Sequence, residues 1–131
     1  PIVAHEYLGN SVEGKDVFIA DDIISSGESV LDIAYELKKR NAKRIFAYAT
    51  YSIFTNGLEK FDQAYNDGFI SGVFGTNLTY RSPELLKREW FHEVDVSKYI
   101  AYFIASLNHD VSISTVIDPH EKIQQLLEKY N

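Results

Sequence analysis

The sequence predicts an α/β protein with a mainly parallel sheet flanked by helices. Short apolar runs, which suit buried strands, alternate with segments whose apolar residues recur at helical spacing. The connections are short, and such connections make right-handed crossovers between parallel strands. The 131 residues, 45% hydrophobic and 14% aromatic, suffice for a single core. In such a fold, ligands bind at the carboxyl ends of the strands.

Two predicted strand–helix pairs fill the first half of the chain. Val17–Ala20 has the unbroken apolar character of a parallel strand covered on both faces. A helix from Ser26 or Gly27 to about Asn41 follows from apolar residues at helical spacing and from basic residues near its end. Alternating apolar residues, with Ile45, Ala47 and Ala49 on one face, predict a strand at Arg44–Thr50. The next helix, Gly57–Asn66, ends at an Asp-Gly turn signal.

The second half continues this alternation. An apolar run predicts a strand at Ile70–Gly75, and Ser82 before Pro83 marks a helix start, with Ser as the N-cap and Pro at the first helical position. The remaining expected elements are a strand at 91–96, a strongly apolar helix at 97–108, an edge strand at 111–117 and an amphipathic helix from 118 to about 130. Residues 1–11 are expected to be mostly loop, with a short extended piece at 2–4.

Charge and composition argue against several classes of function. The net charge is −6 and no basic stripe appears, so we expect no nucleic-acid partner. The sequence contains no Cys, which excludes disulfides and thiolate metal sites, and its four His are scattered rather than clustered. No apolar run reaches the ~18 residues of a membrane span and no signal peptide opens the chain, so we expect a cytoplasmic protein with no membrane partner.

The stretch from Val17 to Val30, VFIADDIISSGESV, carries the predicted binding site. An apolar strand leads into Asp21 and Asp22, and the small polar residues 25–29 open the next helix. The first N–H groups of a helix lack partners and the helix dipole favours an anion, so this loop can bind a phosphate. Adjacent carboxylates would repel a phosphate, but they can accept hydrogen bonds from sugar hydroxyls or help to hold a divalent cation. A sugar phosphate therefore suits both halves of the site, whereas simple capping of the helix is the alternative.

Polar residues follow three of the predicted strands. Asp21 and Asp22 come after the first strand, residues 50–52 after the second and Thr76-Asn77 after the third. Because parallel strands end at the same edge of a sheet, we expect these residues to share one edge.

The run Ile19–Ser29 resembles the ribose-phosphate-binding loop of the type I phosphoribosyltransferase-like fold: an apolar strand, two acids, two apolar residues, then small residues around a Gly. Within that fold the sequence is most similar to ribose-phosphate pyrophosphokinase. Three further segments resemble this family in the same order, namely Leu8–Asn10 with Glu13–Lys15, residues 49–57, and Thr76-Asn77. The resemblance spans about Leu8 to Leu107.

This resemblance implies that ribose 5-phosphate and ATP, with Mg²⁺, are converted to phosphoribosyl pyrophosphate and AMP. It implies that Asp21 and Asp22 hold the ribose hydroxyls. The 5-phosphate would be held by the backbone of residues 25–29 and by the hydroxyls of Ser26 and Ser29. The implied substrate-binding residues are Asp21, Asp22, Ser25, Ser26, Gly27, Glu28 and Ser29. The full-length enzyme is expected to be a homo-oligomer.

Three residues depart from the family pattern. The family usually has Asp at the position of Ser25, a small residue or Gly at that of Glu28, and His at that of Tyr51. Glu28 would be tolerated if its side chain points to solvent, because only its N–H is needed. A Glu28 side chain that points inward would weaken phosphate binding.

The resemblance also implies that this chain is a part of a larger enzyme. The family enzyme has two such domains, and its ATP-contacting loop, its catalytic Lys and Arg, and the first strands of this domain precede the matched segment. The chain begins with Pro1 and contains no Met. We therefore expect residues 1–131 to be a single partial domain, the carboxyl-terminal portion of a two-domain enzyme, with no catalytic residue of its own and no activity alone.

Three alternative functions are considered. A phosphoribosyltransferase that consumes phosphoribosyl pyrophosphate shares the loop, although purine-salvage members carry an acid where this chain has Ser25. A phosphorelay receiver domain also opens with a strand and an acid pair, but it needs an acid after a later strand and a Lys-Pro pair, and Lys98 is followed by Tyr. A non-catalytic regulatory relative of the synthetase would have the same loop.

Overall fold

The computed structural model describes residues 9–114 and 118–130 of the chain. The chain divides into two compact units, Pro1–Val94 and Asp95–Asn131, and each is described by itself. The described strands of the first unit are β1 (Asp16–Ile24), β2 (Arg44–Ser52), β3 (Gly72–Thr76) and β4 (Phe91–Val94), and its helices are α1 (Glu28–Lys39), α2 (Glu59–Asn66) and α3 (Pro83–Leu86). The second unit contains α4 (Ser97–Asn108) and α6 (His120–Tyr130).

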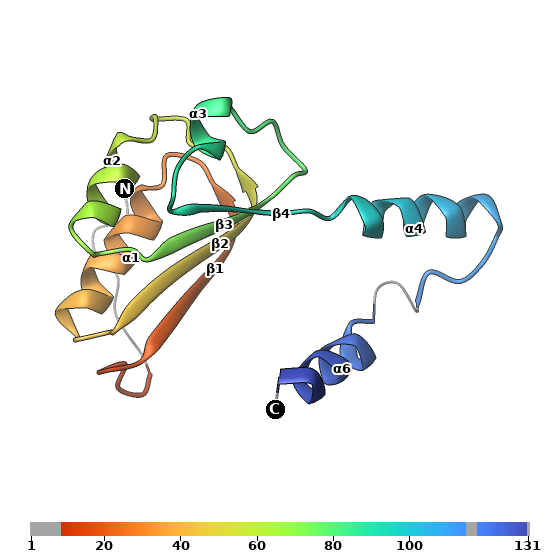
Figure 1. Ribbon diagram of the computed structural model, residues 1–131, viewed down its shortest axis with the longest axis horizontal. Coiled ribbons are helices and arrows are strands. Elements are labelled where there is room, and N and C mark those ends of the chain that lie inside the picture. Colours follow the sequence, from red (N-terminus) through yellow and green to blue (C-terminus); the bar gives the residue numbers. More distant parts are fainter. Residues whose placement is uncertain (1–8, 115–117, 131) are drawn as a thin grey trace. The chain divides into compact units, whose positions relative to one another are not determined.

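The first unit is built on one parallel sheet. Its strands lie in the order β1-β2-β3-β4, and each neighbouring pair is parallel. Strands in sequential order joined by right-handed crossovers place their connecting helices on one face, and α1 and α2 lie on the same side of the sheet (Figure 1). The predicted class, a mainly parallel α/β sheet flanked by helices, is confirmed.

The strand bounds differ from the predicted ones at several ends. β1 continues to Ile24 because its pairing with β2 continues, with Ile24 opposite Ser52. Asp21 and Asp22 therefore lie inside β1, and the prediction that they follow the strand was wrong. The same prediction was wrong for residues 50–52, because β2 continues to Ser52, and for Thr76, which is the last residue of β3. β3 begins two residues later than predicted, at Gly72, and ends on Thr76, while β4 ends at Val94.

The predicted helices are present, with small shifts of their ends. α1 begins at Glu28, one residue after Gly27, and ends before Asn41, which has a positive φ of 60°. Ser82 caps α3, because its Oγ accepts a hydrogen bond from the N–H of Leu85 at 3.1 Å. α4 has the predicted bounds.

Two predicted extended segments are not seen in the described residues. Residues 111–114 are not in a strand, so the described part of the predicted edge strand is wrong, and residues 115–117 lie outside the description. The predicted extended piece at residues 2–4 also lies outside the described residues.

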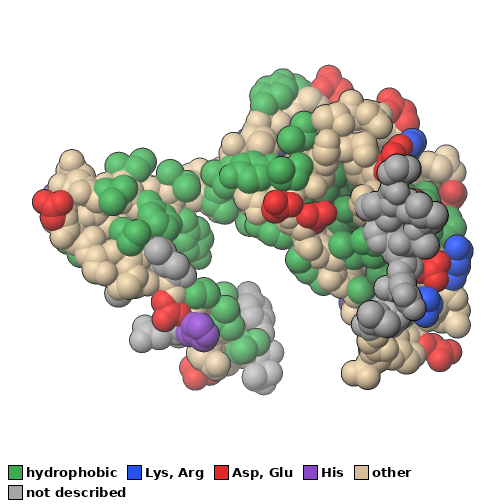
Figure 2. Space-filling model, turned by 180° about the vertical axis from the view of Figure 1, so that it is seen from behind, with side chains coloured by type: hydrophobic (Ala, Val, Ile, Leu, Met, Phe, Trp, Pro, Cys, Tyr) green, Lys and Arg blue, Asp and Glu red, His purple; other side chains and the backbone are tan. Residues whose placement is uncertain are grey.

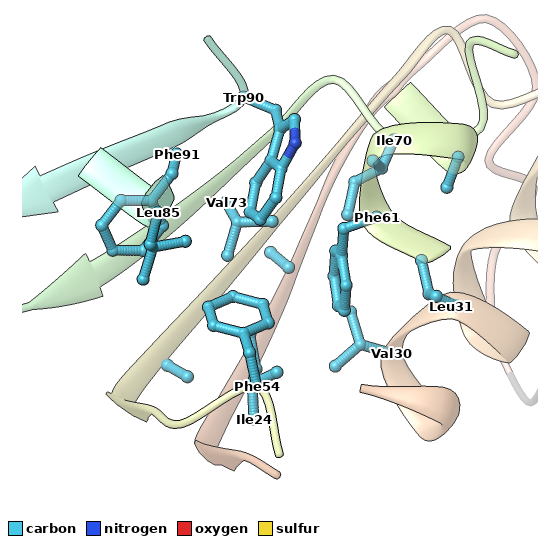
Figure 3. Close-up of a cluster of buried hydrophobic side chains, with 13 residues drawn as sticks. Ile24, Val30, Leu31, Phe54, Phe61, Ile70, Val73, Leu85, Trp90 and Phe91 are labelled. Carbon is cyan, nitrogen blue, oxygen red and sulfur yellow. The ribbon is translucent and has the colours of Figure 1, made fainter. Parts of the chain in front are cut away.

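The core lies between the sheet and its helices. Ile45, Ala47 and Ala49 of β2 are fully buried on this side, as their alternation predicted. Phe61 of α2 stacks on Trp90 with ring centroids 5.4 Å apart. Figure 3 shows these rings at the centre of a cluster of buried side chains contributed by strands, helices and loops. Burial of apolar surface, to which these rings contribute large areas, is the dominant favourable term in folding.

The opposite face of the sheet, here called the open face, carries a second group of aromatic side chains. This group consists of Phe18, Phe46, Tyr48, Phe74 and His92. Their neighbouring rings lie 5.0–6.5 Å apart from centroid to centroid. Phe18 is 57% exposed, so within the described first unit no helix covers this ring.

The second unit is helical. α4 is strongly apolar yet contains no buried residue, and hydrophobic side chains lie at the surface of both units (Figure 2). α6 is amphipathic, with Ile123, Leu126 and Leu127 along one side. Among the described residues, no helix is both long enough and apolar enough to cross a membrane.

Candidate functional site

The two acids stand near the carboxyl end of β1, and both are exposed. Asp21 folds over the backbone, because its Oδ1 accepts a hydrogen bond from the N–H of Asp22 at 2.8 Å. Core-facing residues do not alternate strictly in this part of β1. Ile19 packs against the core, and the next residue of the strand that does so is Ile24, five positions later. This interruption of the alternation keeps neighbouring carboxylates at the surface beside the loop that follows.

The loop Ser25–Gly27 connects β1 to α1. Gly27 is buried and has a φ of 81°, a left-handed conformation that side chains rarely adopt. A Cβ atom at Gly27 would lie 2.2 Å from Cε2 of Phe61, so the loop rests directly on the ring of α2. Only glycine fits this position without movement of the core.

The first turn of α1 is open toward the loop. Gly27 is the N-cap residue and has no side chain with which to cap the helix. Ser26 Oγ accepts a long hydrogen bond of 3.4 Å from the N–H of Glu28. The remaining first-turn N–H groups have no partner within a helix, and the positive end of the helix dipole lies here. This arrangement can accept an anion such as a phosphate.

The side chain of Glu28 points away from the loop. Its Oε1 accepts a hydrogen bond from Nζ of Lys60, on α2, at 2.7 Å. The hydrogen bond and the positive charge of Lys60 lower the pKa of Glu28, and Glu28 in turn raises the pKa of Lys60. The side chain of Glu28 is thus directed outward, which is the orientation that a phosphate-binding loop with an acid at this position requires.

The segment after β2 supports the loop from beside it. The carbonyl oxygen of Ser25 accepts a hydrogen bond from the N–H of Thr55 at 2.9 Å. The carbonyl oxygen of Ile24 accepts one from the N–H of Ile53, also at 2.9 Å. These bonds attach the base of the loop to the neighbouring chain segment and leave its small side chains at the sheet edge.

The residues expected at one sheet edge do share it. β1, β2 and β3 are adjacent parallel strands, so their carboxyl ends lie side by side. Thr76, at the end of β3, donates a hydrogen bond from Oγ1 to the carbonyl oxygen of Thr50 at 2.6 Å. Thr76 is only 1% exposed, so it links two strands rather than facing the site.

Sequence reasoning missed two basic residues near this edge. Lys60 pairs with Glu28, and no local pattern marks a partner 32 positions away. Arg81 donates from one guanidinium nitrogen to the carbonyl oxygens of Asn77 and Thr79, and it also pairs with Glu93. Arg81 thereby fixes the segment after β3, and its only sequence signal is a lone basic residue in a loop.

The donor set for a metal ion is small. Within the described residues, no group of three or more His, Asp or Glu side chains is placed to hold a metal ion. Mg²⁺ usually binds one or two carboxylates together with substrate phosphates and water, and Asp21 and Asp22 fit that pattern.

Comparison with known proteins supports the family suggested by the loop. The phosphoribosyl synthetase-associated domain family matches residues 6–118. The ribose-phosphate pyrophosphokinase of Shewanella oneidensis is 32% identical over 110 residues, which are 84% of this chain and 34% of that protein. That of Vibrio cholerae is 31% identical over 111 residues, covering 85% of this chain and 34% of the relative.

The fold agrees with a solved structure. The phosphoribosylpyrophosphate synthetase from Mycobacterium smegmatis superimposes with a TM-score of 0.67 at 18% sequence identity, over 78% of this chain and 33% of that one. The chain thus spans about a third of the length of the proteins that it matches. Since the family match covers most of the 131 residues, the chain belongs to the phosphoribosyl synthetase-associated domain family.

Proposed function

We propose that this chain is the ribose-phosphate-binding part of a ribose-phosphate pyrophosphokinase. Residues 1–131 would be a single partial domain, the carboxyl-terminal portion of a larger two-domain, homo-oligomeric enzyme. The observation that carries the proposal is the first turn of α1, with glycine at its N-cap, beside two exposed carboxylates at the carboxyl edge of a parallel sheet. The names of the matched relatives support the choice of enzyme.

The two halves of the site would bind the two ends of ribose 5-phosphate. The carboxylates of Asp21 and Asp22 accept hydrogen bonds from the ribose hydroxyls. The backbone N–H groups of residues 25–29, with the hydroxyls of Ser26 and Ser29, donate to the 5-phosphate, whose charge is favoured by the dipole of α1. Ser25, Gly27 and Glu28 contribute through their backbone.

In the complete enzyme the anomeric oxygen of ribose 5-phosphate would attack the β-phosphorus of ATP. The bond from the β-phosphorus to the oxygen that bridges the α and β positions breaks, AMP leaves, and the hydroxyl proton is released. Mg²⁺, when bound, neutralises part of the phosphate charge. This chain positions the sugar for that attack. We assign it no catalytic residue, and we expect it to be inactive alone.

Binding of ribose 5-phosphate by the 131-residue chain, measured by calorimetry, tests the proposal. The doubly substituted Asp21→Asn/Asp22→Asn chain should bind ribose 5-phosphate about tenfold more weakly, because amides are poorer acceptors for the sugar hydroxyls. The same chain should bind inorganic phosphate equally well or more tightly, because two negative charges are removed. Asp67→Asn, which changes an exposed acid at the end of α2, is the control.

Two results would contradict the proposal. One is a wild-type chain that binds ribose 5-phosphate no better than ribose. The other is an Asp21→Asn/Asp22→Asn chain whose affinity for inorganic phosphate falls by as much as its affinity for ribose 5-phosphate. Formation of AMP by the isolated chain from ribose 5-phosphate and Mg-ATP would contradict only the expected lack of activity.

A further inference from the structure

An acid in a phosphate-binding loop is an internal competitor for the ligand. Glu28 is the first residue of α1 and follows Gly27 directly. Unpaired N–H groups and the positive end of a helix dipole attract a carboxylate as they attract a phosphate. A Glu28 side chain free to turn back would occupy donors that a phosphate needs and would repel the phosphate as well.

In the structure the carboxylate of Glu28 is paired with Lys60 of α2 instead of with the N–H groups of α1. Lys60 Nζ lies 2.7 Å from Glu28 Oε1, and the partners come from different helices, α2 and α1. Each side chain is more than half exposed, so the bond is open to solvent. Since each partner shifts the pKa of the other toward its charged form, the pair is fully ionised at neutral pH.

Among the described residues that line the hollow beside Glu28, Lys60 is its one possible cationic partner. The pair borders a surface hollow of about 470 Å³ between α1 and α2. Among the described residues that line this hollow, Lys60 is the only basic one, against the three acids Glu28, Asp32 and Glu59. The negative charge of Asp32 also raises the pKa of Lys60. Loss of the ammonium group would leave three acids and no basic residue among the described residues that line this hollow.

The backbone at Lys60 is anchored by the buried neighbouring residue in α2. Phe61 is fully buried, and its ring is the surface on which Gly27 rests. Adjacent residues of α2 therefore contact the loop region in two ways. Phe61 packs against Gly27, and Lys60 pairs with Glu28.

We propose that Lys60 is a positioning residue for the phosphate-binding loop. It holds the carboxylate of Glu28 away from the open N–H groups of α1 and cancels its charge, so that the loop can bind phosphate although it contains an acid. This inference rests on the proposed function of the loop and adds a residue that lies outside it.

Titration of the 131-residue chain with ribose 5-phosphate, followed by calorimetry, tests the inference. Lys60→Ala should weaken binding about three- to tenfold, as expected for an uncompensated charge near a bound dianion in a solvent-exposed setting. Lys60→Arg should bind like wild type, because the positive charge is kept. The double variant Glu28→Gln/Lys60→Ala should recover wild-type affinity, which a purely structural role of Lys60 would not produce.

Lys39→Ala is the matched control. It removes the same charge and breaks an exposed pair with Glu36, 3.4 Å long, at the other end of α1. Its affinity should stay within about twofold of wild type, because a distant exposed charge is screened by salt. All variants should keep the unfolding midpoint of the wild type, since exposed ion pairs contribute little to stability.

The outcomes separate the two proposals. If wild type binds ribose 5-phosphate but Lys60→Ala binds equally well, or the double variant stays weak, the role of Lys60 is overturned while the proposed function stands. If wild type does not bind ribose 5-phosphate, the proposed function fails and this inference fails with it.

Discussion

The two faces of the sheet carry similar residues in different surroundings. In the core on the covered face, Phe61 of α2 is fully buried and stacks on Trp90. On the open face, Phe18 is 57% exposed, and its ring centroid lies 6.5 Å from that of Tyr48 and 6.1 Å from that of Phe74. The same type of side chain is thus a core residue on one face and a surface residue on the other.

This difference shows what an apolar strand can and cannot reveal. The unbroken apolar run at the start of β1 predicted a strand covered on both faces, as is usual in parallel sheets. The described first unit covers only one of them. Stability should therefore depend on the covered face, whereas the open face contributes through contacts between its own rings.

The largest expected effect compares one substitution on the two faces. Phe61→Ala should lower the free energy of unfolding by about 3–5 kcal/mol, because a buried ring leaves a cavity. Phe18→Ala should lower it by less than about 1 kcal/mol, since its ring is mostly in water already. Urea denaturation measures both values, and similar losses for the two variants would show that the open face is covered in solution.

A smaller effect is expected where the covered face meets the loop. Gly27→Ala should cost about 2–4 kcal/mol, because the added Cβ collides with Phe61 and the backbone has a positive φ. Gly68→Ala is the control, since Gly68 has a φ of 73° but no atom within 4 Å of a Cβ. It should cost only about 1 kcal/mol. Equal losses in thermal or urea unfolding would mean that the contact with Phe61 is unimportant.

The smallest effect concerns pH. Burial alone would raise the pKa of Asp62, but hydrogen bonds from Trp90 and Arg88 outweigh it and lower the pKa below its usual value. Such a group stabilises the fold above the unfolded-state pKa of about 3.9, and this contribution is lost as the pH falls through the lower, folded-state value.

Urea unfolding of wild type and Asp62→Asn between pH 6 and pH 3 measures this contribution. Wild type should lose up to about 1 kcal/mol more than the variant over this range, since the carboxylate is partly exposed. Asp16→Asn, which removes the exposed partner of Arg44, should flatten the profile less. If Asp16→Asn flattened the pH profile more than Asp62→Asn, the exposed Asp16–Arg44 pair would contribute more to the pH dependence than the hydrogen bonds of Asp62 with Trp90 and Arg88.

Local patterns predicted the order of strands and helices well. The alternation in β2 identified its buried residues, and Ser82 before Pro83 identified the start of α3. The end of β1 was missed because apolar periodicity reports burial rather than backbone pairing. Asp21 and Asp22 are polar and exposed, yet they belong to a strand that stays paired to Ile24.

The candidate site was predictable only in part. The loop and the acids follow from adjacent residues, and the shared sheet edge follows from the fold class. The contacts of Gly27 with Phe61 and of Glu28 with Lys60 join α1 to α2, and a single sequence has no signal for such pairs. The role of the loop in binding ribose 5-phosphate stays a prediction.

The contact between Gly27 and Phe61 has an optical consequence. Trp90 is the single tryptophan of the chain, and its indole ring stacks on the phenyl ring that supports the loop. Displacement of that phenyl ring would alter the environment of the indole, whose fluorescence emission is sensitive to its neighbours. The chain therefore contains a natural fluorophore one side chain away from its candidate binding loop.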